Sequence, residues 1–178
     1  YKESPHLEQR VQPQVEFFKR HLIKYSWNIV IANNRPRKDA ISVAKDLNKK
    51  YKQVTYSDIN NPGRGWSLST TWLNSNADIV MYMDADLATN LKSVPAMLAL
   101  LRDGKCDVAI GSRYVQGADA RRTQLRYLLS KGYNVMLRYV LGLRVLDAQC
   151  GFKGIRKSVA EKLIPLTKDR RWFFDTEL

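Results

Sequence analysis

Two patterns of apolar residues alternate along the chain. Apolar residues spaced by about three to four positions predict amphipathic helices, and short continuous apolar runs predict buried strands. The first pattern places helices over 7–22, 38–51, 66–75, 93–101, 124–141 and 157–163, and the second places strands over 27–32, 54–57, 78–83 and 107–111. The last residues form an apolar run that fits either a strand or a helix.

The alternation of strands and helices predicts an α/β fold. Such an order typically builds a mostly parallel sheet with helices on both faces. The 178 residues fit one domain of ordinary size. In these sheets ligands bind beyond the carboxyl ends of the strands. A functional site is therefore expected just after Ala32, Met83 and Ile110.

The composition narrows the kinds of protein that remain. With 44% hydrophobic residues the chain can bury a core, and no apolar run approaches the roughly 18 residues of a membrane span. Two histidines and two cysteines disfavour a multi-histidine metal centre and a Ser-His-Asp triad. The formal charge of +13 predicts an anionic partner: nucleic acid, an anionic membrane surface or a phosphorylated substrate.

Asp84 and Asp86 directly follow the predicted strand 78–83. A D-x-D pair is expected by chance in a chain of this composition, so its position carries the argument. Carboxylates at a strand end can hold Mg²⁺ or Mn²⁺ against a pyrophosphate, because these ions prefer oxygen ligands. The alternative is that Asp86 only caps a turn.

Basic residues follow other predicted strands. Gly63-Arg64-Gly65 places a cation before a helix, which fits phosphate contact, although a plain turn with a solvated arginine explains this segment alone. Arg126 and Ser130 lie four residues apart, hence on one face of a helix, and together suit a phosphate monoester. The alternative there is a solvated basic face. The glycine motifs of Walker A loops and dinucleotide-binding folds are absent.

Two further segments are polar where a core would be apolar. Residues 147–153 include Asp147 and Gln149, whose side chains could orient a sugar. Residues 172–177 place Asp175 and Glu177 behind three aromatic residues, which core packing would also explain.

Taken together, these segments resemble family 2 glycosyltransferases, and most closely the polyprenyl-phosphate sugar transferases of the dolichyl-phosphate glucosyltransferase type. The matching segments, in chain order, are Tyr1-Lys2-Glu3, Ile31-Ala32-Asn33-Asn34, Gly63-Arg64-Gly65, Asp84-Ala85-Asp86-Leu87, Gly111-Ser112-Arg113-Tyr114, Asp147–Lys153 and Phe174–Leu178. Each match is weak alone. Their shared order along the chain makes the resemblance specific.

The resemblance implies a Rossmann-like GT-A fold and metal-dependent, inverting transfer from a nucleotide sugar, of the UDP-glucose or GDP-mannose type, to a polyprenyl or dolichyl phosphate. The donor-binding residues that it implies are Tyr1, Glu3, Asn33, Asn34, Arg64, Asp84, Ala85, Asp86 and Gln149. The implied ligands of Mg²⁺ or Mn²⁺ are Asp84 and Asp86, and the implied catalytic residues are these two and Asp175. The implied contacts of the acceptor phosphate are Arg113, Arg126, Ser130 and Lys131.

The chain departs from the family pattern at two places. Asn33 and Asn34 stand where an aspartate pair is commoner, which leaves the selectivity for the nucleotide base open. Ala88 stands where the mannosyl branch often has a metal-binding glutamine, which weakens a mannosyl assignment.

The charge distribution fits this chemistry. A phosphate acceptor is already anionic and needs little help from a general base, but cations must bring two anionic reactants together. A second hypothesis keeps the fold and takes a sugar hydroxyl as acceptor, with Asp175 or Glu177 as the base. Nucleic acid is not expected as a partner, because base-reading signatures are absent.

Residues 1–178 are expected to form a single catalytic domain that lacks its first strand and its C-terminal part, because the chain starts without Met and within a family motif. The remaining lysines and arginines are expected to attract anionic lipid. We therefore expect the enzyme at the cytoplasmic face of a membrane, either peripheral or anchored through a segment outside this chain.

Overall fold

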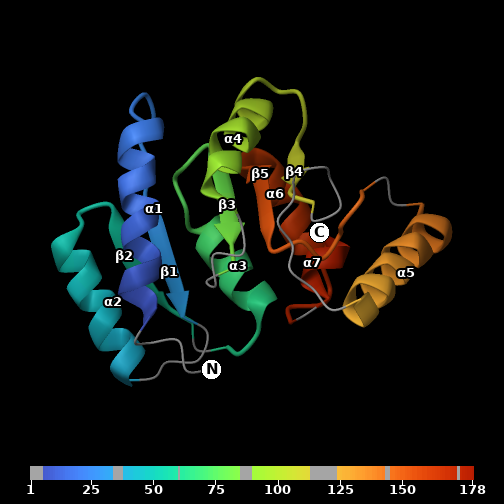
Figure 1. Ribbon diagram of the computed structural model, residues 1–178, viewed down its shortest axis with the longest axis horizontal. Helices are drawn as coiled ribbons and strands as arrows, with labels where there is room; N and C mark the ends of the chain where they lie inside the picture. The colour runs from blue at the N-terminus through green and yellow to red at the C-terminus, as the bar shows by residue number, and fades with distance from the viewer. Residues whose placement is uncertain are drawn as a thin grey trace.

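The computed structural model describes residues 6–33, 38–59, 61–84, 90–112, 124–142, 145–171 and 173–178. Strands and helices alternate along most of the chain (Figure 1). The strands are β1 (Ile29–Asn33), β2 (Val54–Asp58), β3 (Ile79–Met83), β4 (Val108–Ile110) and β5 (Phe152–Arg156). The α-helices are α1 (Leu7–His21), α2 (Lys38–Lys50), α3 (Arg64–Leu73), α4 (Val94–Arg102), α5 (Gln124–Leu141), α6 (Lys157–Leu163) and α7 (Phe174–Glu177), with short 3-10 helices η2 (Leu91–Ser93) and η3 (Ile164–Leu166).

Each helix and strand expected from the apolar pattern is present, with ends that shift by a few residues. The shift with the largest consequence is in α3, which begins at Arg64 rather than Trp66. Arg64 therefore belongs to the first turn of a helix and not to the loop before it. The ambiguous apolar run at the end of the chain contains the short helix α7.

The described strands form two sheets. β1 pairs with β2 in parallel, from Ile29 opposite Val54 to Asn33 opposite Asp58. β5 lies between β3 and β4 and runs antiparallel to both, so β3 and β4 are parallel to each other. The sequence pattern did not predict β5.

β5 escapes the apolar pattern because Lys153 and Gly154 interrupt it. The lysine is buried and has charged and polar partners, which are described below. A Cβ on Gly154 would lie 2.8 Å from Leu101 Cδ1 and 3.0 Å from Met81 Cγ, so the position packs directly against α4 and β3. Lys153 and Gly154 fit a central strand because the lysine is paired in the tertiary structure and the glycine allows close packing.

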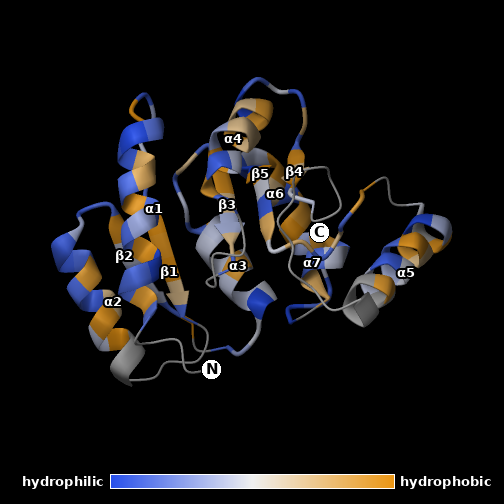
Figure 2. Ribbon diagram, viewed as in Figure 1, coloured by the Kyte–Doolittle hydropathy of each residue, from blue (hydrophilic) through white to orange (hydrophobic). Residues whose placement is uncertain are grey.

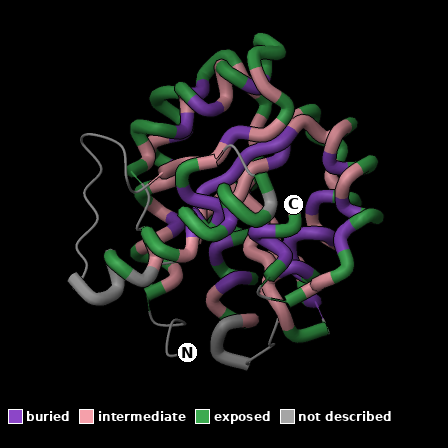
Figure 3. The backbone as a smooth tube through the Cα atoms, turned by 90° about the vertical axis from the view of Figure 1, so that its right-hand side faces the viewer, coloured by how far each residue is buried: buried purple, intermediate pink, exposed green. Residues whose placement is uncertain are grey.

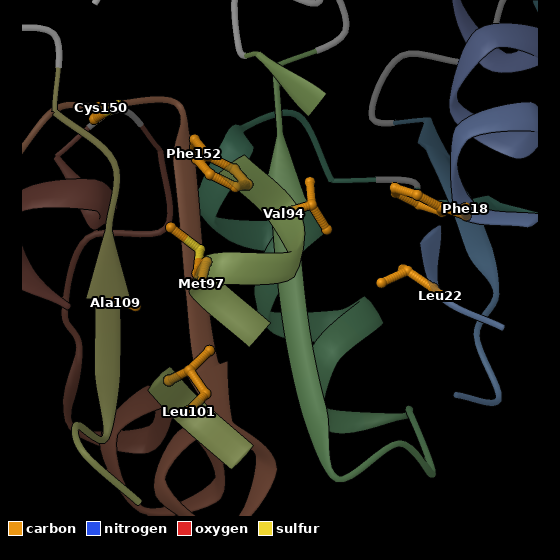
Figure 4. Close-up of a cluster of buried hydrophobic side chains, with 8 residues drawn as sticks. All are labelled: Phe18, Leu22, Val94, Met97, Leu101, Ala109, Cys150 and Phe152. Atoms are coloured by element: carbon orange, nitrogen blue, oxygen red, sulfur yellow. The ribbon is translucent and has the colours of Figure 1, made fainter. Parts of the chain in front are cut away.

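Helices cover both faces of the three-stranded sheet. On one face α4 packs over the strands, with Met97 and Leu101 against Phe152 of β5, and the end of α1 adds Phe18 and Leu22 from one side (Figure 4). The residues of this cluster are Phe18, Leu22, Val94, Met97, Leu101, Ala109, Cys150 and Phe152. This confirms the expectation of helices on two faces, and Figure 3 shows the buried segments passing through the middle of the molecule.

The opposite face packs against α3, α6 and α7. Trp72, Val80, Ile155 and Phe174 contribute to this second cluster. The side chains of β3 alternate accordingly, since Val80 belongs to this cluster while its neighbour Met81 packs against the first. Tyr82 follows Val80 on the same face and is half-buried there.

Helix α5 lies apart from both sheets, at the right edge of the view in Figure 1. Its contacts with the rest of the chain include a hydrogen bond from the Ala148 amide to Asn134 Oδ1, at 3.0 Å, and one between the hydroxyls of Tyr133 and Thr176, at 3.4 Å. Within the described residues, no helix combines the length and apolar character required to cross a membrane.

Candidate active site

A cluster of charged side chains lies at the end of β3, where residues of α3, β5 and α7 meet Asp84. The Asp84 amide donates to the Gly151 carbonyl at 2.9 Å, which extends the pairing of β3 with β5 by one step. A Cβ on Gly151 would lie only 1.8 Å from Asp84 Oδ2. The place of the Asp84 carboxylate therefore depends on a glycine at position 151.

Arg64 connects Asp84 to Asp175. Its Nη2 lies 2.9 Å from Asp84 Oδ1, and its Nη1 donates to Asp175 Oδ2 at 2.8 Å. Burial alone would lower the pKa of Arg64, but the hydrogen bond to Asp175 and the charge of Asp84 together raise it. The guanidinium is thus a permanent cation held between two carboxylates from distant parts of the chain.

The glycines beside Arg64 allow close packing of two backbone segments. The amides of Gly65 and Trp66 donate to the carbonyls of Arg171 and Arg170, at 3.2 and 2.9 Å. A Cβ on Gly65 would lie 2.6 Å from the Arg170 carbonyl carbon, and Gly63 has a φ of 137°. These two backbone amides of the first turn of α3 therefore bind residues 170 and 171. The side chain of Arg64 is the part of this turn that contacts Asp84 and Asp175.

Asp175 accepts hydrogen bonds on both carboxylate oxygens. Oδ2 binds Arg64, and Oδ1 accepts from the Tyr82 hydroxyl and lies 3.4 Å from Lys153 Nζ. Lys153 Nζ also donates to the Asp175 backbone carbonyl. Since its side chain is only 4% exposed, Asp175 is an interior carboxylate with three donors around it.

The partners of Asp175 have shifted pKa values. Burial lowers the pKa of Lys153, and the charge of Asp175 acts in the opposite direction. Burial raises the pKa of Tyr82, and the negative charge of Asp175 raises it further. At neutral pH Tyr82 is therefore a neutral hydrogen-bond donor.

Exposure divides the cluster into an inner and an outer part. The inner side chains, Lys153 and Asp175, are 2% and 4% exposed. The outer side chains, Arg64 and Asp84, are 29% and 36% exposed. A ligand in solution can therefore reach the arginine and the aspartate of the outer pair, while the inner pair lies beneath them.

The remaining donor-site residues that are described lie at two other positions. Asn33 ends β1, and its Nδ2 donates to the Tyr56 hydroxyl at 3.3 Å and to Asp58 Oδ1 at 3.5 Å. Gln149 is exposed, between the buried Ala148 and Cys150 and two residues before Gly151. The predicted site residues that lie outside the described residues are Tyr1, Glu3, Asn34, Ala85, Asp86 and Arg113.

The expected acceptor residues lie on α5. Ser130 is half-buried and Lys131 is exposed, one residue further along the helix. Arg126 also belongs to α5, but its side chain lies outside the described part. Because Tyr133 of α5 contacts Thr176, which follows Asp175, this helix lies beside the segment that carries the inner carboxylate.

Two members of the cluster were not identified from the sequence. Tyr82 lies within an apolar strand, and Lys153 lies within a segment whose polar residues are unlike those of a core. The available signal for Lys153 was its place directly after Phe152 in a matched family segment. Its role depends on a partner 22 residues away, which no local pattern indicates.

The chemistry of Asp84 fits a divalent cation. Its carboxylate is partly exposed at a strand end, and Mg²⁺ commonly takes one or two protein carboxylates together with substrate phosphates. Within the described residues no group of three or more His, Cys, Asp or Glu side chains forms a ready-made metal site. A cation at Asp84 would therefore depend on further oxygen ligands, for which Asp86 is the expected protein source.

Comparisons with known proteins agree with this architecture. The pattern of the family described as Glycosyl transferase family 2 matches residues 5–164. Over its whole length the chain is 28% identical to glycosyltransferase AglD of Haloferax volcanii, of which it covers 29%. It is 28% identical to the dolichyl-phosphate beta-glucosyltransferase of Drosophila melanogaster and 24% identical to that of Homo sapiens. In each case the match includes 86% of this chain and about half of the relative, 50% and 51%.

Proposed function

Because the chain belongs to glycosyl transferase family 2, with its α/β GT-A fold, we propose that it transfers a sugar from a nucleotide-sugar donor to a polyprenyl phosphate of the dolichyl type. The observation that carries this proposal is the placement of Arg64 against Asp84 at the end of β3, with both side chains partly exposed to solvent. The relatives named dolichyl-phosphate beta-glucosyltransferase supply the acceptor class, and they favour glucose as the sugar.

Arg64 is the proposed contact of the donor diphosphate. When the bond between the sugar and the nucleotide breaks, negative charge develops on the departing diphosphate, and a preorganised cation lowers the energy of that state. Asp84, with Asp86, would hold Mg²⁺ or Mn²⁺, which would supply further charge stabilisation when bound. The Asp84 carboxylate and the Arg64 guanidinium thus offer both kinds of partner that a metal-bound diphosphate requires.

The proposed acceptor side is α5. Ser130 provides a hydroxyl and Lys131 an ammonium group on successive residues, and Arg126 lies one turn earlier on the same helix. These are suitable groups for a phosphate monoester. A phosphate oxygen that attacks the sugar from the face opposite the diphosphate inverts the anomeric centre, so an α-linked donor yields a β-linked lipid product.

The arrangement of Asp175 and Glu177 favours this acceptor over a sugar hydroxyl. A hydroxyl acceptor needs a base to take its proton. Asp175 is buried and accepts from Arg64 and Tyr82, and Glu177 Oε2 accepts from the backbone amides of Lys168 and Asp169, at 2.9 and 2.8 Å. Both carboxylates are engaged by donors within the protein, so each would have to give up such a contact to meet an acceptor hydroxyl.

The exposed face of α5 supports a membrane surface as a partner. Its exposed apolar residues are Leu128, Val135, Met136, Tyr139 and Val140. Their spacing places these positions in a stripe on one side of the helix. Figure 2 shows apolar segments along α5. Lys131 and Arg138 border the stripe, and the stretch from Ala120 to Leu146 contains no acidic residue. A polyprenyl acceptor resides in a bilayer, so a basic, apolar helix near the acceptor residues fits the membrane interface. The cytoplasmic face is proposed on the same grounds.

An assay of sugar transfer tests the proposal. The protein is incubated with UDP-glucose or GDP-mannose, a short polyprenyl phosphate and Mg²⁺ or Mn²⁺, and the lipid product is separated by thin-layer chromatography. We expect transfer to polyprenyl phosphate, and loss of transfer in Asp84→Ala. Transfer to a soluble sugar acceptor with none to polyprenyl phosphate would contradict the proposed acceptor class. Full activity in Asp84→Ala would contradict the proposed role of Asp84.

A further inference from the structure

Lys153 is a buried lysine at the centre of the three-stranded sheet. It lies on β5, opposite Tyr82 of β3 and Ile110 of β4, and is 1% exposed. A buried charge is costly unless it is paired and hydrogen-bonded. The position therefore calls for a compensating interaction.

Asp175 provides that interaction in two ways. Lys153 Nζ donates to the Asp175 backbone carbonyl and also lies 3.4 Å from its Oδ1. One ammonium group thereby fixes both the main chain of α7 and the charge of its carboxylate. Asp175 also accepts from Arg64 Nη1. Asp175 is therefore the one side chain that lies between Lys153 and the outer pair of Arg64 and Asp84.

The charges along this path alternate in sign. From the interior outward they are Lys153, Asp175, Arg64 and Asp84, with two cations and two carboxylates. Without the lysine, the same path would hold one cation against two carboxylates. An anionic diphosphate would then meet a more negative surface at Arg64.

We propose that Lys153 is a positioning residue for the donor: it balances the charge of Asp175, so that Arg64 remains attractive to the donor diphosphate. The inference rests on the proposed function, because it takes Arg64 as the diphosphate contact. It assigns Asp175 to orient Arg64 rather than to take a proton. Lys153 itself is too deeply buried to touch the donor.

A purely structural ion pair would behave differently under substitution. If Lys153 and Asp175 only stabilise the fold, then removing either charge lowers stability and lowers ligand affinity together. If Lys153 sets the charge at Arg64, the two removals have opposite effects on an anion. Lys153→Met makes the path more negative, whereas Asp175→Asn makes it less negative.

The test measures UDP and GDP binding to the full chain by isothermal titration calorimetry, with thermal unfolding of the same samples. The variants are Lys153→Met, Lys153→Arg, Asp175→Asn and the double variant Lys153→Met/Asp175→Asn. Lys157→Met is the matched control, since Lys157 begins α6 and pairs with Glu161 instead. UDP and GDP serve as probes of the diphosphate contact in the absence of turnover.

We expect Lys153→Met to weaken binding of the better nucleotide by about tenfold, comparable to the loss of an outer-shell partner in metal sites. Asp175→Asn removes the negative charge but keeps an amide oxygen that can accept the hydrogen bond from Arg64, so it should bind as tightly as wild type or more tightly, although it lowers the melting temperature. The double variant and Lys153→Arg should bind close to wild type, and so should Lys157→Met. The KM for polyprenyl phosphate should stay constant in Lys153→Met.

Two results would overturn the inference, and they differ from each other. In the first, nucleotide affinity and melting temperature fall together, not only in Lys153→Met but also in Asp175→Asn and in the double variant. Lys153 would then be a structural residue, and the proposed donor site would be unaffected. Absence of UDP and GDP binding in the folded wild-type protein would instead remove the proposed function, and this inference with it.

Discussion

The charged cluster and helix α5 are built in opposite ways. The cluster joins side chains from α3, β3, β5 and α7, and its inner members are almost fully buried. Helix α5 lies outside the sheets and leaves Leu128, Tyr139 and Val140 at 63%, 88% and 73% exposure. The charged side chains of the cluster find their partners within the protein, whereas α5 exposes apolar side chains to its surroundings.

This difference corresponds to the two proposed substrates. A nucleotide sugar arrives from water with a fixed arrangement of charge, so a rigid set of opposing charges can be prepared for it. A polyprenyl phosphate stays in the bilayer, so the residues that meet it have to reach a membrane surface. The contrast between a closed cluster and an open helix is therefore expected of an enzyme that joins these two substrates.

The largest effect is expected from Arg64→Ala. Loss of a preorganised charge-stabilising group commonly lowers kcat by roughly 100- to 1,000-fold. The same substitution leaves Asp175 buried with one donor fewer, so a lower melting temperature should accompany the loss. Steady-state transfer assays and thermal unfolding check both effects. Arg102→Ala is the control, because Arg102 is an exposed arginine of α4 that pairs with Asp103. Activity within a fewfold of wild type in Arg64→Ala would contradict the role of Arg64.

Gly151→Ala should have the next largest effect. A Cβ at this position would overlap Asp84 Oδ2, so the carboxylate or the β3–β5 pairing has to move. Displacement of a first contact at an active site by about an ångström can cost about a hundredfold in rate. The matched control is Gly132→Ala on α5, where a Cβ meets no heavy atom within 4 Å. That change should stabilise the helix by about 0.5–1 kcal/mol, because alanine is the better helix former. Equal activities of Gly151→Ala and Gly132→Ala would show that activity does not depend on the position of the Asp84 carboxylate.

The elements of the fold could be predicted because their apolar residues follow local periods. The residues Val11, Val15 and Phe18 are spaced for one helix face, and all three are buried in α1. The exception is β5, where Lys153 is stabilised by Asp175 of a different element. A strand with a buried lysine cannot be distinguished from a polar loop until its partner is known.

The cluster was only partly predictable for the same reason. Asp84 and Arg64 were found through their places at a strand end and before a helix. Their shared neighbour Asp175 lies 111 residues after Arg64, and the ion pair between them depends on the tertiary fold. The Gly63-Arg64-Gly65 segment predicts phosphate contact through its arginine, and the structure adds that its two glycines pack against Arg170 and Arg171. The motifs thus point to residues of this cluster without showing what each of them contacts.

Asn134→Ala tests the connection between α5 and the rest of the chain. Asn134 is 6% exposed, its Oδ1 accepts from the Ala148 amide, and its Nδ2 donates to the Ser130 carbonyl at 2.9 Å. Alanine leaves a buried amide without its acceptor, which typically costs about 1–3 kcal/mol. Chemical denaturation measures the loss, with the exposed Asn76→Ala as control. A loss no larger than that of the control would show that α5 is held by other contacts.

The smallest effect on stability is expected from Tyr139→Ser combined with Val140→Ser. Both side chains are largely exposed on α5, and surface substitutions usually change the free energy of unfolding by no more than about 0.5 kcal/mol. Binding to vesicles that contain anionic lipid should weaken, because the variant removes apolar area from the proposed contact surface. Vesicle co-sedimentation and denaturation of the same preparation measure the two quantities.

Leu166→Ser is the control, because Leu166 is 74% exposed but belongs to η3 rather than to α5. A loss of stability well above 0.5 kcal/mol in the α5 variant, without weaker vesicle binding, would mean that this stripe packs against protein. The contrast between the closed charged cluster and an open helix α5, the proposed acceptor side, would then no longer hold.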